Sequence, residues 1–512
     1  MDLTSGTLAI PLRDGSSKER TSAMFLRIII TLCLTGFFIA PANAGSRADV
    51  LKKLNDSAST KGSPEAKSWR IFFDAYLQMT PPPLPVSDLF NMNTVWPGMD
   101  GWSEVSIWAE QNEHMAEAFV ESAKRALIGI PYGSEQVPDE YSEHGIVAEI
   151  GVDGHLHSFH FGYVDSVQLA CLWSTAELYR LFEAGETTRA IELLMSELIV
   201  LRKFCDREFL KEQLTFMPML GDALSNTRDM FYKYRTSLTP SQFRDFSKEG
   251  IPFLRTDPTR LLMPEGDRVV GEALLDELFT TTGDADPAKF REILTDIQAS
   301  QEPLTRFGAA KYWESIARSH SGRNSTSNRL NKIYDDWWRR WKMRTFHPQL
   351  SVDTELQKSN PVRYAAVNLI IRDIQELFYQ RDLLTTQING TAVSAALCGY
   401  KNHYGVYPRF LKMMYAQLLH RSSNLDLFRP LPLRTVADWS LYEFPVGSFH
   451  YRKITKDTKI TAKNGEILIK KGNALLYSVF TDNEDDRGLH TGEDILIWPP
   501  LKSLERSAGI LE

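Results

Sequence analysis

The feature that constrains this chain most is a long stretch with helical periodicity, from Val362 to Gly399. Apolar residues recur there at spacings of three and four, at positions 367, 370, 371, 374, 377, 378, 384, 388 and 392. This spacing is typical of an amphipathic helix that buries one face. Charged residues, including Arg372 and Asp373, interrupt the stretch and exclude a membrane-embedded helix. The sequence therefore predicts one long helix packed against a globular body.

Length and composition are those of an ordinary globular protein. The chain has 512 residues, of which 43% are hydrophobic and 24% charged. This length corresponds to roughly two to four domains of about 100–200 residues each. With 58 basic and 65 acidic residues, the net charge is -7, so no general basic surface indicates a nucleic-acid partner.

A short apolar run near the N-terminus resembles a secretion signal. Residues 25–40 read FLRIIITLCLTGFFIA, and Pro41 is followed by small residues at Ala42 and Ala44, a pattern that predicts cleavage after residue 44. We expect residues 1–44 to be a signal peptide, with Met24 as a second candidate start. The protein is then exported to the periplasm, the cell envelope or the medium. The alternative is a membrane anchor, if segment 25–40 is not cleaved.

The pattern of the mature chain predicts a mostly α fold with a C-terminal α+β domain. Residues 45–360 form a multi-helix body with a small β-hairpin near 146–161, and residues 361–512 form the long helix and an antiparallel sheet. Helices are expected at 103–127, 165–183, 187–206, 209–234, 241–247, 269–280, 287–299, 307–319 and 326–344. Short β-rich runs at 443–480 flank Asn464-Gly465, a strong hairpin signal.

The cysteines do not form a disulfide framework. Removal of the signal peptide leaves Cys171, Cys205 and Cys398. In a helical hairpin that turns near Gly185, Cys171 and Cys205 would lie roughly 10 Å apart, because an α-helix rises about 1.5 Å per residue. We therefore expect buried free thiols.

Residues 392–498 resemble the globular domain of type II secretion major pseudopilins, a pattern also found at the C-terminus of uncharacterised exported bacterial proteins. The resemblance depends on the end of a helix at Ala395-Ala396-Leu397, on His403–Pro408 (HYGVYP), and on Leu475–Asp482 (LLYSVFTD) before an acidic loop. Two positions depart from the family, because Phe480 and Asn483 stand where glycines are common. No prepilin-peptidase site or apolar stalk precedes the region. The resemblance implies a borrowed domain rather than a pseudopilus subunit.

The resemblance also implies a calcium site in the acidic loop. Six carboxylates lie within 13 residues, at positions 482, 484, 485, 486, 493 and 494, and a hard cation with oxygen ligands would relieve their repulsion. The expected ligands are Ser478, Asp482, Asp485, Asp486 and Asp494. The alternative is a solvated acidic loop whose charges are screened.

Four of the 11 histidines fall between His144 and His160. On a strand His155 and His157 would project from one face, and two such imidazoles suit zinc if Asp153 or Glu149 supplies a third ligand. The alternative is a polar, half-exposed hairpin without a metal.

A pair of tryptophans, Trp337 and Trp341, lies one helical turn apart. They are expected to pack between helices; a glycan- or headgroup-binding platform remains open if both indoles are exposed. No G-x-S-x-G, Walker A, G-x-G-x-x-G, H-E-x-x-H or C-x-x-C motif is present.

These patterns favour a non-enzymatic exported scaffold or interaction module with a calcium-stabilised C-terminal loop. Its partner would be an unknown protein or envelope component, and a membrane only if segment 25–40 is retained. The alternative is a metal-dependent hydrolase centred on the His155/His157 hairpin.

Overall fold

Helices form most of the described chain, and short antiparallel strands lie near its C-terminal end. The computed structural model describes residues 44–84, 91–249, 261–301, 306–343, 347–415, 417–419, 449–480, 484–490 and 494–510. From Ser46 onward these residues belong to one compact unit. The predicted mostly helical fold with a C-terminal antiparallel sheet is confirmed at this level. The predicted signal segment, residues 25–40, lies outside the described residues.

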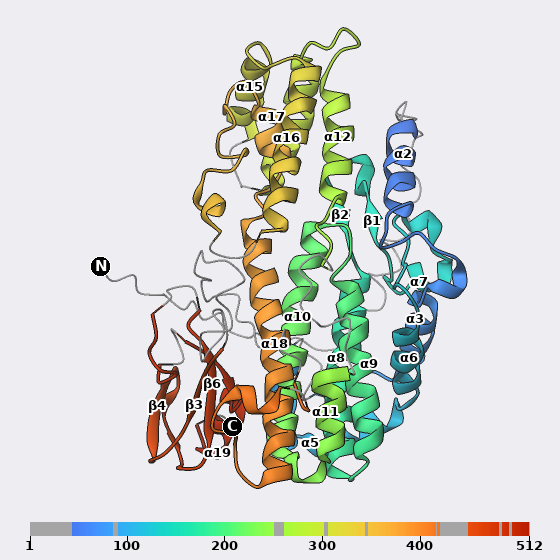
Figure 1. Ribbon diagram of the computed structural model, residues 1–512. Helices are drawn as coiled ribbons and strands as arrows, with labels where there is room; N and C mark the ends of the chain where they lie inside the picture. The colour runs from blue at the N-terminus through green and yellow to red at the C-terminus, as the bar shows by residue number, and fades with distance from the viewer. Residues whose placement is uncertain are drawn as a thin grey trace, which may run out of the picture. The chain divides into compact units, whose positions relative to one another are not determined.

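The N-terminal part combines short helices with one small hairpin, drawn in blue to cyan in Figure 1. Its helices are α2 (Ala44–Asn55), η1 (Pro64–Ala66), α3 (Trp69–Tyr76), η2 (Met92–Thr94), α5 (Trp102–Gln111), α6 (His114–Lys124), η3 (Ser134–Gln136) and α7 (Asp139–Ser142). The hairpin joins β1 (Glu149–Ile150) to β2 (Phe159–His160), with η4 (Val152–Gly154) between them. The strands are antiparallel, with Glu149 opposite His160, as the sequence predicts.

Four long helices form the centre of the fold (Figure 1): α8 (Tyr163–Glu183), α9 (Thr187–Phe204), α10 (Leu210–Lys233) and α18 (Gln375–Tyr404). Helices α8 and α9 form the predicted hairpin. It turns at Gly185, whose φ of 78° favours glycine. Helix α18 packs along α10, so residues far apart in the sequence share the centre of the molecule.

The remaining helices lie between α10 and α18 in the sequence. They are η5 (Arg235–Ser237), α11 (Pro240–Arg244), η6 (Asp245–Glu249), α12 (Gly266–Leu278), α13 (Pro287–Lys289), η8 (Phe290–Leu294), α14 (Thr295–Gln301), α15 (Arg306–Ala317), α16 (Arg323–Trp341), η9 (Pro348–Ser351) and α17 (Ala365–Ile370). Helices α12, α15, α16 and α17 lie together at the upper end of Figure 1.

The C-terminal strands form a three-stranded antiparallel sheet and a separate hairpin. The sheet has the order β3 (His450–Lys453), β6 (Ala474–Ser478), β7 (Ile495–Trp498), and the hairpin pairs β4 (Thr458–Ala462) with β5 (Gly465–Ile469). Helix α18 is followed by η10 (Leu411–Met414), and α19 (Leu501–Ser507) follows β7. Pairing of Ala462 with Gly465 puts Lys463-Asn464 in the turn, one residue earlier than the predicted Asn464-Gly465.

The helical part and the three-stranded sheet share one hydrophobic core, which extends in sequence from Val50 to Trp498. Strand β7 approaches α18 at Gly390, where a Cβ would lie 2.7 Å from Cγ2 of Ile497. Strands β4 and β5 bury a second, smaller cluster with Leu475 and Leu504.

A buried polar cluster ties the hairpin region to α10. The carboxylate of Glu212 accepts hydrogen bonds from Tyr132 Oη (2.7 Å) and Tyr163 Oη (2.5 Å). The Nε of Arg207 donates to Glu212 Oε1 at 3.0 Å, and both charged side chains are fully buried. Because one of the tyrosines begins α8, this cluster fixes where the chain leaves the hairpin.

Two predicted helices are interrupted. The stretch 362–399 divides into α17 and α18, and in the segment between them Asp373 Oδ1 accepts the backbone N–H of Gln375, the first residue of α18, at 3.0 Å. The stretch 103–127 divides at Asn112, a buried residue whose side chain bonds Thr80 and the carbonyl of Trp108. In the part of the chain that the structure describes, no helix combines the length and hydropathy required to span a bilayer.

Candidate functional site

The predicted histidine pair lies in the connection between η4 and β2, not on a strand. His155 is exposed and His157 is half-buried. Their ring centroids are nevertheless 5.6 Å apart, so the structure brings the two imidazoles together. Burial lowers the pKa of His157, the neighbouring imidazole of His155 adds to this effect, and Asp296 opposes it.

Of the two proposed third zinc ligands, the side chain of Asp153 lies outside the described residues, and Glu149 has a different partner. Glu149 lies on β1 of the hairpin, and its Oε1 accepts a hydrogen bond from Ser134 Oγ at 3.0 Å. Within the described ranges no group of three or more His, Cys, Asp or Glu side chains is arranged to hold a metal. The pair by itself does not form the three-ligand site that catalytic zinc requires.

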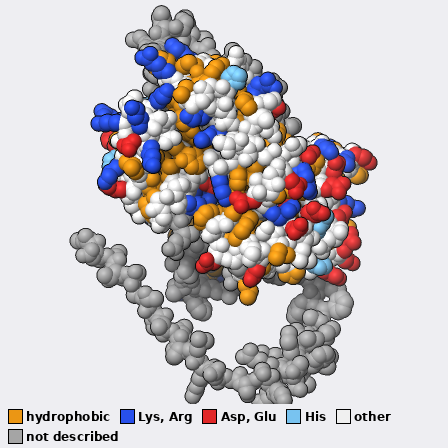
Figure 2. All heavy atoms as spheres, turned by 90° about the horizontal axis from the view of Figure 1, so that it is seen from below, with side chains coloured by type: hydrophobic (Ala, Val, Ile, Leu, Met, Phe, Trp, Pro, Cys, Tyr) orange, Lys and Arg blue, Asp and Glu red, His pale blue; other side chains and the backbone are white. Residues whose placement is uncertain are grey.

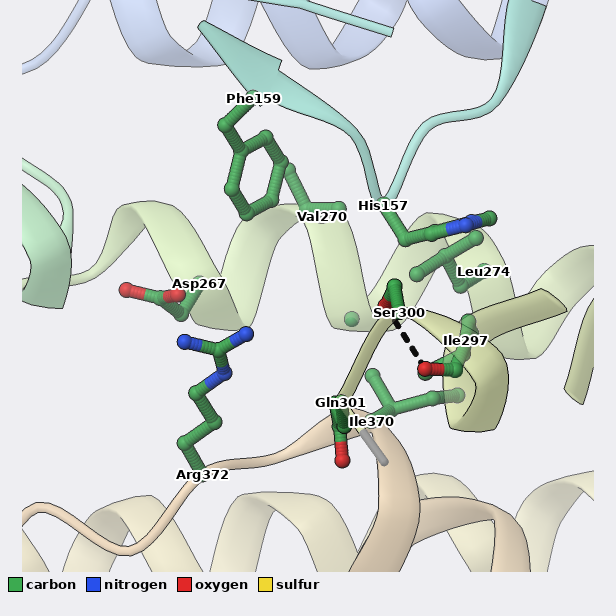
Figure 3. Close-up of a pocket in the computed structure, with 11 residues that line it drawn as sticks. His157, Phe159, Asp267, Val270, Leu274, Ile297, Ser300, Gln301, Ile370 and Arg372 are labelled. Atoms are coloured by element: carbon green, nitrogen blue, oxygen red, sulfur yellow. Dashed lines mark hydrogen bonds between the residues drawn. The ribbon is translucent and has the colours of Figure 1, made fainter. Parts of the chain in front are cut away.

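His157 instead forms one wall of a pocket between the hairpin, α12, α14 and α17 (Figure 3). The pocket contains about 440 Å³ of empty space, open solvent at its mouth included. One part of its lining is apolar and consists of Phe159, Val270, Leu274, Ile297 and Ile370, next to Gly271. The polar lining residues are His157, Asp267, Ser300, Gln301 and Arg372.

Two oppositely charged side chains face each other at one side of this pocket. Figure 3 shows the Arg372 guanidinium extending towards the carboxylate of Asp267. Asp267 Oδ2 accepts the backbone N–H of Leu210 at 2.8 Å. Burial raises the pKa of Asp267 to about 6, although the Leu210 hydrogen bond and the charge of Arg372 both lower it.

The other polar groups of the pocket are held by backbone contacts. Ser300 Oγ donates to the carbonyl of Ile297 at 2.7 Å, and Gln301 Nε2 donates to the carbonyl of Leu369 at 3.2 Å. The sequence does not indicate Asp267 and Arg372 as site residues, because no spacing connects residues so far apart. Only the packing of α12 against the segment between α17 and α18 brings them together.

The predicted acidic loop follows β6, and it is described only in part. Ser478 and Asp494 are buried, whereas Asp485 is exposed and Asp486 is half-buried. Asp482 and Glu493 lie outside the described residues. Four of the five predicted calcium ligands therefore lie among the described residues, and the calcium site stays a prediction.

Hydrogen bonds give this loop a defined shape. Asp494 Oδ2 accepts the backbone N–H of Gly488 at 2.8 Å, and Asp485 Oδ1 accepts Tyr477 Oη at 2.9 Å. Asp485 also lies 3.3 Å from His450 Nδ1. Burial and the nearby carboxylates of Asp485 and Asp494 raise the pKa of Tyr477 well above its usual value.

No family model, no curated protein and no solved structure matches this chain. Interpretation of these sites therefore depends on their geometry. The resemblance of residues 392–498 to pseudopilins stays a prediction.

The tryptophan pair does not form a binding platform. Trp337 and Trp341 are 1% and 2% exposed. Trp341 Nε1 donates to the carbonyl of Leu261 at 2.8 Å, and the guanidinium of Arg381 lies 4.7 Å from its ring centroid. Both indoles are helix-packing residues, so a glycan site at these positions is excluded. The predicted free thiols are confirmed, because Cys171, Cys205 and Cys398 are all buried and unbridged.

Proposed function

We propose that this protein is an exported, non-enzymatic scaffold or interaction module of the bacterial envelope, and that its C-terminal region binds the partner. The observation that carries the proposal is a basic, partly apolar surface around the end of α18 and the β4–β5 hairpin, which we call the basic end.

The segment after α18 supplies the apolar part of the basic end. Three large hydrophobic side chains are 50–52% exposed there: Tyr404, Val406 and Met413. Two exposed cations flank the half-buried ring of Phe410, with Arg409 Cζ 5.1 Å and Lys412 Nζ 5.5 Å from its centroid. Cations around exposed apolar groups are typical of an interaction surface rather than of a solvated face.

The β4–β5 hairpin and its flanks supply further positive charge. Five lysines are exposed there: Lys456, Lys459, Lys463, Lys470 and Lys471. The acidic residues of the same stretch are Asp457 and Glu466, so the balance is positive. Figure 2 shows basic side chains interspersed with hydrophobic ones on the side where these strands lie, and acidic side chains gathered on the opposite side. An anionic envelope component is the complementary partner.

The pseudopilin-like interpretation is a second part of this proposal. It is supported by the order of a long helix followed by antiparallel strands, and by the backbone at Phe480. This residue has a φ of 53°, a left-handed conformation that favours glycine, and the family has glycine at this position. In the proposed calcium site, Ser478, Asp485, Asp486 and Asp494 would supply oxygen ligands together with Asp482.

Binding to envelopes tests the proposed function. Full-length protein is mixed with a washed bacterial envelope fraction and sedimented at low and high salt. We expect sedimentation that weakens at high salt, because screening reduces attraction between exposed charges. The variant Arg409→Glu with Lys412→Glu should lose most of this binding.

A matched control separates the basic end from net charge. The variant Lys311→Glu with Lys332→Glu makes the same change in charge at exposed positions on α15 and α16 and should sediment like the wild type. Equal sedimentation of all three proteins would show that the basic end is not a binding surface.

A metal-dependent hydrolase at the His155/His157 hairpin is the alternative function, favoured by the 5.6 Å separation of the two rings and by the pocket beside them. It is tested by zinc binding in isothermal titration calorimetry. Tight zinc binding that is lost in His157→Ala but kept in His144→Ala would favour this alternative over the scaffold.

A further inference from the structure

The pocket beside His157 contains an arrangement that neither the scaffold nor the metal proposal uses. Arg372 is exposed, and it makes no hydrogen bond or ion pair with the residues that the structure describes. Its guanidinium nevertheless extends towards Asp267 across one side of the pocket (Figure 3). A cation and a carboxylate that face each other without forming an ion pair leave room for a ligand that carries both charges.

The rest of the lining is suited to an apolar group. Val270 and Leu274 project from α12, while Ile297 and Ile370 project from α14 and α17. With the ring of Phe159 they form an apolar wall next to the two charges. Small-ligand sites commonly combine such a wall with a few convergent polar groups.

We propose that this pocket binds a small zwitterion, namely an α-amino acid with an aliphatic side chain. The α-carboxylate would contact the guanidinium of Arg372, and the α-ammonium would contact the carboxylate of Asp267. The side chain would lie against the apolar wall. This inference goes beyond the proposed function and does not depend on it, because the pocket lies on helices that do not contribute to the basic end.

The charges of the pocket exclude simpler ligands. A monocarboxylate would pair with Arg372 but would be repelled by the carboxylate of Asp267. A monoamine would pair with Asp267 but would be repelled by the guanidinium of Arg372. Only a ligand with adjacent positive and negative groups satisfies both side chains, and this adjacency is the defining chemistry of an α-amino acid. The wall favours an aliphatic side chain over a polar one, because burial of apolar area drives the binding.

Calorimetric titration of the full-length protein tests the proposal with three probes: L-leucine, 4-methylpentanoate, which lacks the amine, and 3-methylbutylamine, which lacks the carboxylate. We expect L-leucine to bind at least about tenfold more tightly than either analogue, because each analogue loses one charged hydrogen bond. Equal affinity for the three probes, or no binding of L-leucine, would overturn the proposal.

Two variants and a control locate the binding site. Arg372→Gln removes an exposed charge and should weaken L-leucine binding about tenfold or more. Asp267→Asn keeps an acceptor for the Leu210 N–H and should weaken binding similarly. Arg363→Gln removes another exposed arginine, outside the pocket lining, and should bind like the wild type. If Asp267→Asn fails to fold, Arg372→Gln still decides the question, since unchanged affinity in that variant would contradict the assignment.

Discussion

Glu197 is a buried carboxyl on α9, next to Ser174 of α8. Burial raises its pKa from 4.5 to about 8. Between these two values the folded protein holds a proton that the unfolded chain has released. The free energy of unfolding contributed by this residue therefore falls as pH rises through the window and levels off above pH 8.

Replacement of Glu197 by Gln should remove this dependence. Relative to the wild type, Glu197→Gln is expected to gain about 1 kcal/mol of stability for each pH unit between about 5 and 8. Urea unfolding at several pH values in this window measures the effect. Glu192→Gln, an exposed position on the same helix, is the control, and a stability difference that does not vary with pH would contradict the prediction.

The carboxylates near Tyr477 give a prediction about metal content. If the loop holds calcium, the chelated protein should unfold at a lower temperature, and added calcium should restore about 2.7 kcal/mol of stability at a concentration 100 times the Kd. Differential scanning calorimetry measures the change. The variant Asp485→Asn with Asp494→Asn should lose the response, whereas Glu466→Gln on the exposed side of β5 should keep it. If calcium does not change the melting temperature of the wild type, the calcium site is contradicted and the loop is a solvated acidic loop.

At the scale of elements, a lysine from another helix binds the C-terminal end of α6. Lys203 Nζ on α9 donates to the carbonyls of Ser122, Ala123 and Arg125 at 2.5–2.9 Å. The Ser122 carbonyl also accepts the backbone N–H of Arg125 at 3.3 Å, whereas the carbonyls of Ala123 and Arg125 lie beyond the last donor that α6 can supply. Burial lowers the pKa of Lys203 to about 8, so the ammonium remains mostly charged at neutral pH.

Lys203→Met should remove the ammonium donor from the half-buried carbonyls of Ala123 and Arg125 and cost about 1–3 kcal/mol of stability. Chemical denaturation of the full chain measures the loss. Lys124→Met serves as the control, because this lysine is exposed on α6 itself, and it should change stability by less than about 0.5 kcal/mol. Equal effects of the two substitutions would show that the capping contacts contribute nothing.

Sequence periodicity predicted the α8–α9 hairpin and the existence of most other helices, because their buried faces repeat every three to four residues. It did not predict the ends set by single polar side chains. Asp373 binds the first backbone N–H of α18 within an otherwise continuous apolar pattern, and Asn112 ends α5 through bonds to a distant segment. The start of α18 was visible in the sequence as an Asp before a helical run. The end of α5 depends on the tertiary contact of Asn112.

The candidate site was predictable only in part, for the same reason. Proximity in sequence was sufficient to bring His155 and His157 together. The position of Asp267 opposite Arg372 depends on helix packing between distant segments, and no local sequence pattern predicts it.

At the scale of the whole molecule, the C-terminal helix is held to the helical body by a buried ion pair. Arg506 Nη1 of α19 lies 2.5 Å from Asp229 Oδ2 of α10, and the hydroxyls of Tyr179 and Ser503 also donate to this carboxylate. Both charged side chains are less than 10% exposed. Lys502 adds bonds of 2.5 Å to the side-chain oxygens of Asn93 and Asn226.

Removal of one partner of this pair should be costly, because the other charge stays buried. Asp229→Asn or Arg506→Met is expected to lower the free energy of unfolding by about 3–5 kcal/mol. The double variant should cost less than the sum of the two. Urea unfolding of the four proteins forms the cycle, and strictly additive losses would show that the pair does not interact.

The same ion pair has a consequence for the order of events during synthesis. Asp229 is made long before Arg506, because the two residues are 277 positions apart in the sequence. A nascent chain cannot complete the buried surface of α10 until α19 has left the ribosome. The central helices thus lack these contacts through most of their own synthesis, and they acquire their full stability only after α19 has been made.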